Sequence, residues 1–188
     1  MRTALICLSS LAVLYTIAPR NASAQAADFT GTYTAADGAE QIVEQAIQQA
    51  VAKMNVIARP IARSRLKKTN SPYRVIRIEQ QPAQLTFQFD HRQPLELPAD
   101  GRAIKWARED GEVLDVSARL QDGVITQTFQ AEDGQRTNRF TLGPDGATMT
   151  LDVTVSSPRL PEPLAYSLDY HRQVGRENPH REFTGDGR

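Results

Sequence analysis

The stretch VLDVSARLQDGVITQTFQAEDGQRTNRFTLGPDGATMTLDVTVS, residues 113–156, decides the fold of this chain. Apolar and polar side chains alternate through four successive runs, which is the period of a β-strand with one buried face. The runs are separated at Asp122-Gly123, at Asp133-Gly134 and at 143–146. An Asp-Gly pair supplies the positive φ that a tight hairpin requires. We therefore predict four consecutive antiparallel strands joined by short turns.

The same alternation continues on both sides of this stretch. A stiff loop with three prolines, 157–163, is followed by a last predicted strand at 164–171. The strands predicted upstream cover residues 29–33, 73–79, 84–90, 95–97 and 102–107. The chain thus contains about ten strands in a row, most of them connected by hairpins.

Between the first and second predicted strands the apolar period becomes helical. Apolar residues recur every three or four positions from Ala39 to Ile57, with glutamate, glutamine and lysine on the other side. We expect Pro60 to stop or kink this helix, and 61–68 to form a second short helical turn before Asn70-Ser71-Pro72 breaks the chain. The prediction is a helical pair inserted into a run of strands.

The fold class follows from the need to protect sheet edges. Ten strands with one apolar face each bury that face and lose their unpaired edges when the sheet closes on itself. We predict a mainly β fold, an antiparallel up-and-down barrel of about ten strands with a helical insertion between the first and second strands. The alternative is a half-barrel with the amphipathic helix packed across its open mouth.

The N-terminus has the three parts of a secretory signal peptide. Arg2 provides the positive start, an apolar stretch too short to span a bilayer runs from Ala4 to Ala18, and small residues precede cleavage after Ala24 or Ala26. We predict a signal peptide at 1–26, a lipocalin-like β-barrel domain at 27–172 and a disordered tail at 173–188. The protein is then periplasmic or secreted.

Composition excludes several classes of function. Cys7, the only cysteine, lies inside the signal peptide, so the mature chain has no disulfide and no cysteine nucleophile or cysteine-bound metal. The 22 basic and 22 acidic residues balance, which gives a nucleic-acid partner no electrostatic support. No other segment is apolar enough to span a bilayer, so membrane contact is at most peripheral. We expect a monomer without metal or cofactor.

The predicted order of elements resembles that of the intracellular fatty-acid-binding proteins and, more loosely, the lipocalins, which together form the calycin group. The stretch from Phe29 to Tyr33, with Gly31 between, is similar to the Phe-x-Gly-x-aromatic opening of these families, and 98–102 to a hairpin of the fatty-acid-binding branch. The resemblance implies a barrel that encloses a lipid-like ligand. The last strand, 164–170, lacks the Arg-x-Tyr pair with which that branch holds a carboxylate.

Aromatic side chains on the inward face of the predicted strands are the candidate ligand-binding residues. A barrel of about ten strands is wide enough to hold an apolar ligand, although the same rings also fill a solid core. The candidates are Phe87, Phe89, Trp106, Phe129, Phe140, Tyr166 and Tyr170.

A basic run lies on the predicted second helix, which would form a lid over the barrel mouth. It consists of Arg59, Arg63, Arg65, Lys67 and Lys68. These cations suit docking on anionic lipid, where each adds about 1 kcal/mol, or steering of an anionic ligand. The alternative is an ordinary solvated helix face.

Other polar residues are weaker candidates. Arg136 and Arg139 lie on opposite faces of one predicted strand, and Arg119 points to the solvent side of a neighbouring strand. One of the three would hold an anionic group if the interior is partly polar. The alternative is pairing with acids on the outer surface. His171 beside Asp169 has no neighbouring motif that would make a serine nucleophile.

These observations favour an exported, non-enzymatic protein that carries a small apolar or amphipathic molecule inside a β-barrel. The alternative is an exported protein-interaction module, such as a barrel that inhibits a protease. An enzyme is the third hypothesis, because barrels of this kind host chemistry without a recognisable motif.

Overall fold

A computed structural model describes residues 27–108 and 111–173, so the predictions for residues 1–26 and 174–188 lie outside the described ranges. Within these ranges the chain forms ten strands and two helices. The strands are β1 (Gly31–Ala35), β2 (Val75–Gln80), β3 (Gln84–Phe89), β4 (Leu95–Pro98), β5 (Ile104–Ala107), β6 (Val113–Gln121), β7 (Val124–Gln130), β8 (Gln135–Leu142), β9 (Thr148–Ser156) and β10 (Leu164–Arg172). The helices are α1 (Ala39–Val51) and α2 (Ala58–Thr69).

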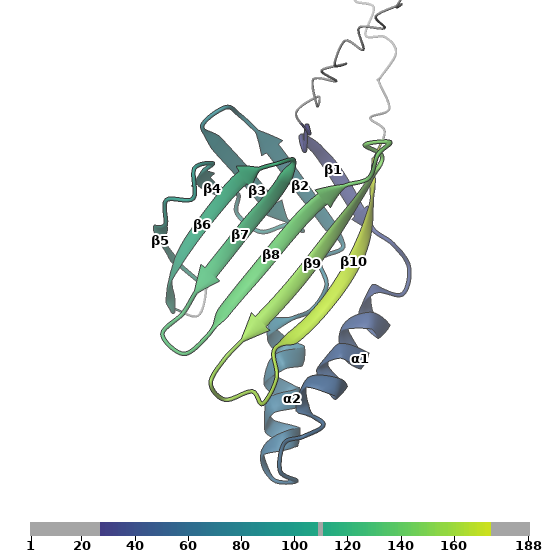
Figure 1. The fold of residues 1–188 in the computed structure, drawn as a ribbon, viewed down its shortest axis with the longest axis vertical. Helices are drawn as coiled ribbons and strands as arrows, with labels where there is room; N and C mark the ends of the chain where they lie inside the picture. Colours follow the sequence, from purple (N-terminus) through teal and green to yellow (C-terminus); the bar gives the residue numbers. More distant parts are fainter. Residues whose placement is uncertain (1–26, 109–110, 174–188) are drawn as a thin grey trace, which may run out of the picture.

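All ten strands belong to one antiparallel sheet in the order β4-β3-β2-β1-β10-β9-β8-β7-β6-β5. The sheet curves until the chain after β4 meets β6, where Gly101 N–H donates to Ala118 O at 2.9 Å and Leu120 N–H to Ala99 O at 3.1 Å. The barrel is therefore nearly closed, as Figure 1 shows. The predicted fold class is confirmed, including the helical insertion between the first and second strands.

The inner face of the barrel is the apolar face that the alternation predicts. In β10 the buried residues are Leu164, Tyr166, Leu168 and Tyr170, and the side chains between them are exposed. One hydrophobic cluster includes inward side chains from all the long strands and from α1. The alternating side chains after Tyr73 thus point into a shared interior, where removal from water stabilises the fold.

The two helices cover one end of the barrel (Figure 1). Helix α1 buries Val43, Ile47 and Ala50 and packs against β10, whereas α2 buries Leu66, packs on α1 and returns the chain to the barrel. Glu44 on α1 accepts hydrogen bonds from Arg63 and Lys67 of α2, which ties the helices to each other. Neither described helix is long and apolar enough to cross a membrane.

The prediction that Pro60 ends or kinks the first helix is wrong. Helix α1 already ends at Val51, and Pro60 lies in the first turn of α2. A proline is tolerated there because the first N–H groups of a helix have no partner within the helix. The helical period continued to Ile57 in the sequence, but Val56 and Ile57 lie in the turn between the helices and are exposed.

The barrel end away from the helices is closed by its own side chains. The Arg172 guanidinium lies 5.3 Å from the ring centroid of Tyr33 and donates to the Tyr33 hydroxyl at 2.7 Å and to Asp28 O at 2.6 Å. The Tyr33 hydroxyl in turn donates to Phe29 O at 2.9 Å. Phe29 and Tyr33 are fully buried, so this end is packed, and Arg172 Nε is buried there without a hydrogen-bond partner among the described residues.

Candidate ligand site at the barrel mouth

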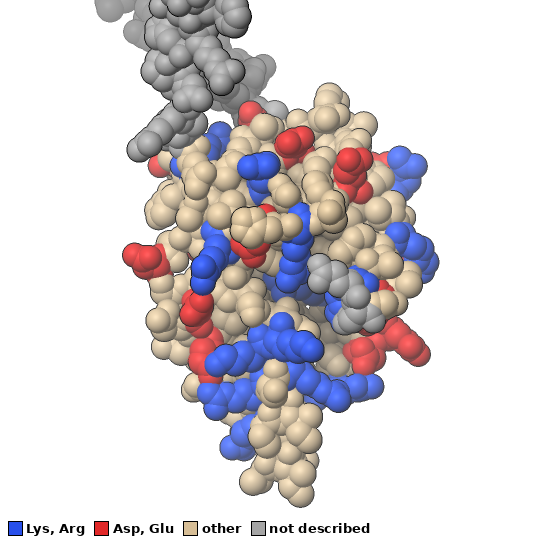
Figure 2. All heavy atoms as spheres, turned by 180° about the vertical axis from the view of Figure 1, so that it is seen from behind, with Lys and Arg blue, Asp and Glu red and all other residues tan. Residues whose placement is uncertain are grey.

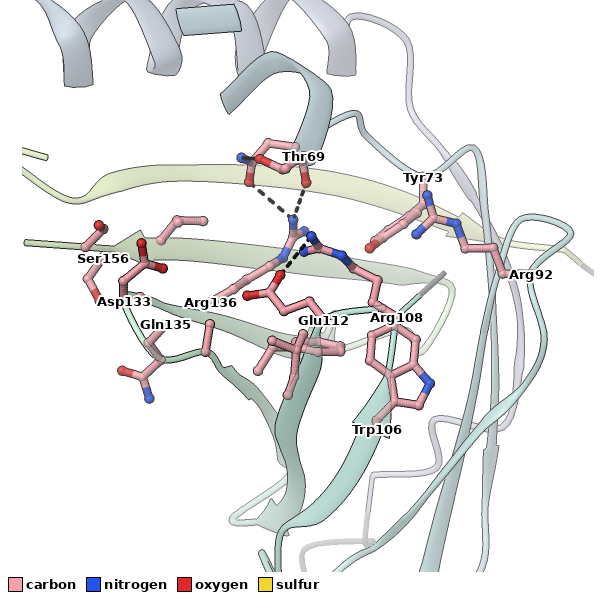
Figure 3. Close-up of a pocket in the computed structure, with 17 residues that line it drawn as sticks. Thr69, Tyr73, Arg92, Trp106, Arg108, Glu112, Asp133, Gln135, Arg136 and Ser156 are labelled. Atoms are coloured by element: carbon pink, nitrogen blue, oxygen red, sulfur yellow. Dashed lines mark hydrogen bonds and ion pairs between the residues drawn. The ribbon is translucent and has the colours of Figure 1, made fainter. Parts of the chain in front are cut away.

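A cavity of about 350 Å³ opens at the helical end of the barrel. The end of α2, the β3–β4 turn, β5 and β6, the β7–β8 hairpin and the end of β9 all contribute to its wall (Figure 3). Its size lies at the lower end of the range for small-molecule sites, roughly 300–1,000 Å³. We call it the mouth cavity.

Arg136 on β8 is the central polar residue of the mouth cavity. It is half-buried, and its Nε donates to Asn138 Oδ1 at 2.9 Å. Its Nη1 donates to Asn70 Oδ1 at 3.2 Å and to Thr69 O at 3.4 Å. All these acceptors are neutral, and within 27–108 and 111–173 no carboxylate pairs with this guanidinium. A half-buried cation without a counter-ion attracts an anion.

A second cation converges on the same place. The ring of Tyr73 stacks on Phe89 with 4.3 Å between the centroids. The guanidinium of Arg136 lies 5.8 Å from the Tyr73 centroid, and that of Arg92, from the β3–β4 turn, lies 5.7 Å from it. Two positive charges around one ring repel each other, and a negative group between them would relieve that repulsion.

The acids in the cavity wall are matched by other arginines. Glu112 accepts from Arg108 at 2.8 Å (Figure 3), and Asp133 pairs with Arg159 at 3.0 Å. Neither ion pair involves Arg136 or Arg92. These two acids therefore do not neutralise the positive charge beside Tyr73.

The opposite wall is apolar. Trp106 and Phe129 meet edge to face with 6.0 Å between their centroids, and Leu114 and Val155 lie beside them. Aromatic walls of this kind bury hydrocarbon favourably. The mouth cavity therefore combines a cationic side with an apolar side, which fits a molecule that has both characters.

A polar path leads from Arg136 into the barrel. Asn138 accepts from Arg136 and donates through Nδ2 to Gln127 Oε1 at 3.0 Å; both amide side chains are fully buried. The Nε2 of Gln127 is buried and has no hydrogen-bond partner among the described residues. A buried donor without a partner is costly, and neither Asn138 nor Gln127 is among the residues that line the mouth cavity.

The structure separates the seven predicted aromatic residues into two groups. Trp106 and Phe129 line the mouth cavity. The other five belong to the buried core: Phe87, Phe89, Phe140, Tyr166 and Tyr170. Their contact with a ligand stays a prediction.

The two core tyrosines use their hydroxyls near the mouth. Tyr170 donates to Tyr73 O at 3.0 Å, and the Tyr166 hydroxyl lies 3.5 Å from Asn70 Oδ1. Burial raises the pKa of both phenols. They therefore remain neutral at physiological pH; Tyr166 contacts the end of α2, and Tyr170 contacts the segment between α2 and β2.

The basic run maps onto α2, outside the mouth cavity. Arg63 and Lys67 pair with Glu44, while Arg59 donates to the carbonyls of Ala52 and Met54 at 2.8 Å. The residues that the sequence did not single out are Asn70, Tyr73 and Arg92. Asn70 lies at a helix end and Arg92 in a turn, where no periodic pattern marks a residue as inward. Tyr73 was predicted to begin the strand 73–79, but it precedes β2, which begins at Val75.

The structure also settles the orientation of the weaker candidates. Arg136 faces inward, Arg139 is exposed, and Arg119 lies on the outside with Asp100 O at 3.2 Å. The Ser167 hydroxyl donates to Asp152, and Asp169 accepts from the Thr150 hydroxyl at 2.9 Å. Both partners are therefore engaged across β9–β10 rather than with the exposed His171.

Comparison with known proteins identifies the fold. No protein-family model and no curated protein matches the chain. A secretary abundant heat soluble protein from Ramazzottius varieornatus has a similar structure, with TM-score 0.54, 7% identity, and coverage of 77% of this chain and 95% of that one. Human cRBP IV gives TM-score 0.48 at 14% identity and covers 78% and 99% of the two chains.

Caenorhabditis elegans lipid binding protein 8 gives TM-score 0.46 at 10% identity, with coverage of 77% and 95%. Identities this low concern the fold alone. The strand order and the helical pair between the first two strands give this chain a calycin-like barrel, as the resemblance in the sequence implied.

Proposed function

We propose that this protein binds a small amphipathic anion at the mouth of its barrel. The anionic group lies between Arg136 and Arg92, and the apolar part lies against Trp106 and Phe129. The observation that carries this proposal is the Arg136 guanidinium, which is half-buried beside a cavity and contacts only neutral acceptors in the described chain.

The chemistry of the site limits the ligand class. A guanidinium binds a carboxylate, sulfate or phosphate through charge-assisted hydrogen bonds, which are stronger than neutral ones. The volume of about 350 Å³ accommodates the head and the first part of a hydrocarbon chain. These features suit a carrier or binder and need no chemical step.

The test compares two arginines of one strand. Arg136→Gln removes the inward cation, and Arg139→Gln removes an exposed cation from the outer face of β8. Binding is measured by fluorescence of 8-anilinonaphthalene-1-sulfonate and by its displacement with oleate or with oleyl alcohol. We expect Arg136→Gln to weaken oleate about 10- to 100-fold, the value of a charged hydrogen bond, and oleyl alcohol by much less.

Arg139→Gln is the matched control and should bind oleate like the unaltered chain. Thermal unfolding of both variants separates a loss of binding from a loss of structure. Equal oleate affinity in all three proteins, or an equal loss for oleate and for the alcohol, contradicts the proposed role of Arg136.

We further propose that residues 1–26 direct export and are then removed. The apolar stretch from Ala4 to Ala18 and the small residues around Ala24 and Ala26 support this. The intact mass of the protein recovered from periplasmic and extracellular fractions tests it. A mass that includes residues 1–26, or recovery only from cytoplasm, rules it out.

A further inference from the structure

A row of stacked rings runs from the mouth cavity into the barrel. Tyr73 lines the cavity and stacks on Phe89, with 4.3 Å between the ring centroids. Phe89 stacks on Phe87 at 6.2 Å, and Phe87 stacks on Phe140 at 5.6 Å. Rings at these separations attract one another in addition to burying apolar area. We call these four residues the aromatic column.

The aromatic column crosses the interior of the barrel. Phe87 lies on β3 and Phe140 on β8, and four strands lie between β3 and β8 in the order of the sheet. Neighbouring strands are about 4.8 Å apart, so side chains on strands this distant can touch only across the interior. The contact between these two rings therefore bridges the barrel from one wall to the other.

The inward side chains around the column are packed against one another. A side chain that borders a hollow wide enough for a water molecule exposes area to that hollow. One inward side chain from each of six strands is 0% exposed: Ile78, Phe87, Val116, Ile125, Phe140 and Met149. The middle of the barrel is therefore a filled core of native density rather than an extension of the mouth cavity.

The mouth cavity ends at this core. Of the aromatic column, only Tyr73 is among the residues that line the cavity. Asn138 and Gln127, which continue inward from Arg136, are fully buried and do not line it. At about 30 Å³ for each water-sized group, the volume of about 350 Å³ holds roughly a dozen non-hydrogen atoms.

The rim of the mouth cavity is polar. Arg92, Asp133 and Gln135 line the cavity and are exposed. Figure 2 shows Lys and Arg side chains gathered at the helical end of the molecule, where the cavity opens. A hydrocarbon chain that extends past this rim stays in water and gains no hydrophobic free energy there.

We propose that the mouth cavity selects compact anions of roughly a dozen non-hydrogen atoms, and that the aromatic column sets this limit. The inference rests on the proposed binding of an anion between Arg136 and Arg92. The ligand is a medium-chain or single-ring acid, whose apolar part lies against Trp106 and stops at the column. A long-chain acid such as oleate binds through its head and first carbons only.

The test is a series of saturated carboxylates from butyrate to tetradecanoate. Each acid displaces 8-anilinonaphthalene-1-sulfonate from the unaltered chain, below the concentration at which that acid forms micelles. A methylene that enters an apolar site contributes about 0.8 kcal/mol, which is about fourfold in affinity. We expect affinity to rise by about this factor per methylene up to decanoate, and by less than about threefold in all from decanoate to tetradecanoate. A hollow barrel would give a further rise of about 200-fold over those four methylenes.

Shortening the aromatic column should move the limit. Phe89→Ala removes the ring that stacks on Tyr73 and opens space next to the cavity, so tetradecanoate should bind about 10-fold or more tightly than decanoate. Phe29→Ala is the matched control, because it empties a fully buried ring position at the far end of the barrel. It should leave the dependence on chain length unchanged. Thermal unfolding shows whether each variant folds, and the series on the unaltered chain needs neither variant.

The outcomes separate this inference from the proposed function. A rise in affinity through tetradecanoate in the unaltered chain, with a loss in Arg136→Gln, overturns the length limit and leaves the anion site in place. That result would also support the prediction from sequence that Phe87 and Phe140 contact the ligand. If no acid displaces the probe, or if Arg136→Gln has no effect, the proposed function fails and this inference with it. A folded Phe89→Ala variant that behaves like the unaltered chain contradicts the role of the column.

Discussion

Each end of the barrel has an arginine beside a tyrosine ring, but only the pair at the mouth borders a cavity. At the far end Arg172 lies 5.3 Å from the ring of Tyr33, and at the mouth Arg136 lies 5.8 Å from the ring of Tyr73. The far-end tyrosine is fully buried and hydrogen-bonds both to the arginine and to the backbone. The mouth tyrosine is half-buried and borders a cavity.

The difference shows what separates a structural arginine from a binding one. Among the described residues both arginines donate only to neutral acceptors, but Arg172 lies in a packed end of the barrel, where its Nε is buried without a partner. Arg136 contacts amides and a carbonyl beside open volume and meets a second cation, Arg92, at the same ring. A cation that borders a cavity and has no acidic partner in the protein can bind an anionic group of a ligand.

Removal of the tyrosine at each end should separate stability from binding, and it has the largest expected effect. Tyr33→Ala empties a fully buried site and deprives Arg172 of an acceptor, so the free energy of unfolding should fall by about 3–5 kcal/mol. Tyr73→Ala should cost only about 1–2 kcal/mol. Urea unfolding measures both.

The same two variants should reverse their order in ligand binding. Tyr73→Ala loosens Arg136 and Arg92 and should weaken binding of 8-anilinonaphthalene-1-sulfonate, whereas folded Tyr33→Ala should bind it normally. Equal effects of the two substitutions on both measurements would remove the distinction between the ends.

Acid should loosen the helical end through Glu44, a smaller effect. Hydrogen bonds from Arg63, Gln48 and Lys67 lower the pKa of this carboxyl from 4.5 to about 2. A lowered pKa in the folded state means that the contribution is complete above pH 4.5 and is lost as the pH falls toward 2. The protection factors of the α2 amides, which correct for the intrinsic pH dependence of exchange, should therefore fall across this window.

The control is Glu44→Gln, which cannot ionise. Its α2 amides should exchange faster than those of the unaltered chain at neutral pH, and the difference between the two proteins should shrink as the pH falls from 4.5 to 2. A difference that stays constant with pH would show that the carboxyl does not tie α2 to α1.

The smallest effect is expected for Gly31→Ala at the far end. A Cβ at this position would lie 3.4 Å from Arg172 Nε and 3.5 Å from Tyr33 Cε2, which are ordinary contacts. We expect the free energy of unfolding to change by less than about 0.5 kcal/mol, because the methyl fits and the unfolded chain loses freedom. A decrease of more than about 1 kcal/mol in the free energy of unfolding, measured with urea, would show that the packed far end of the barrel does not accommodate the added methyl group.

Sequence alone was sufficient for the architecture because strand and helix periods are local. The alternation in 113–156 assigned each side chain to a face, and the Asp-Gly pairs placed the turns. Tyr166 and Tyr170 were therefore correctly predicted to face inward. The helix boundary at Val51 was missed, since it depends on the Asn55 cap and the Arg59 contacts rather than on the period of apolar residues.

The mouth cavity was decided by tertiary structure. Arg136, Tyr73 and Arg92 come from a strand, a connection and a turn, and nothing in their local sequence says that they meet. Their convergence depends on the register of β8 with β9, on the curvature that brings β3 opposite β8, and on where α2 ends. A local pattern determines which way a side chain points; only the closed barrel determines what lies across from it.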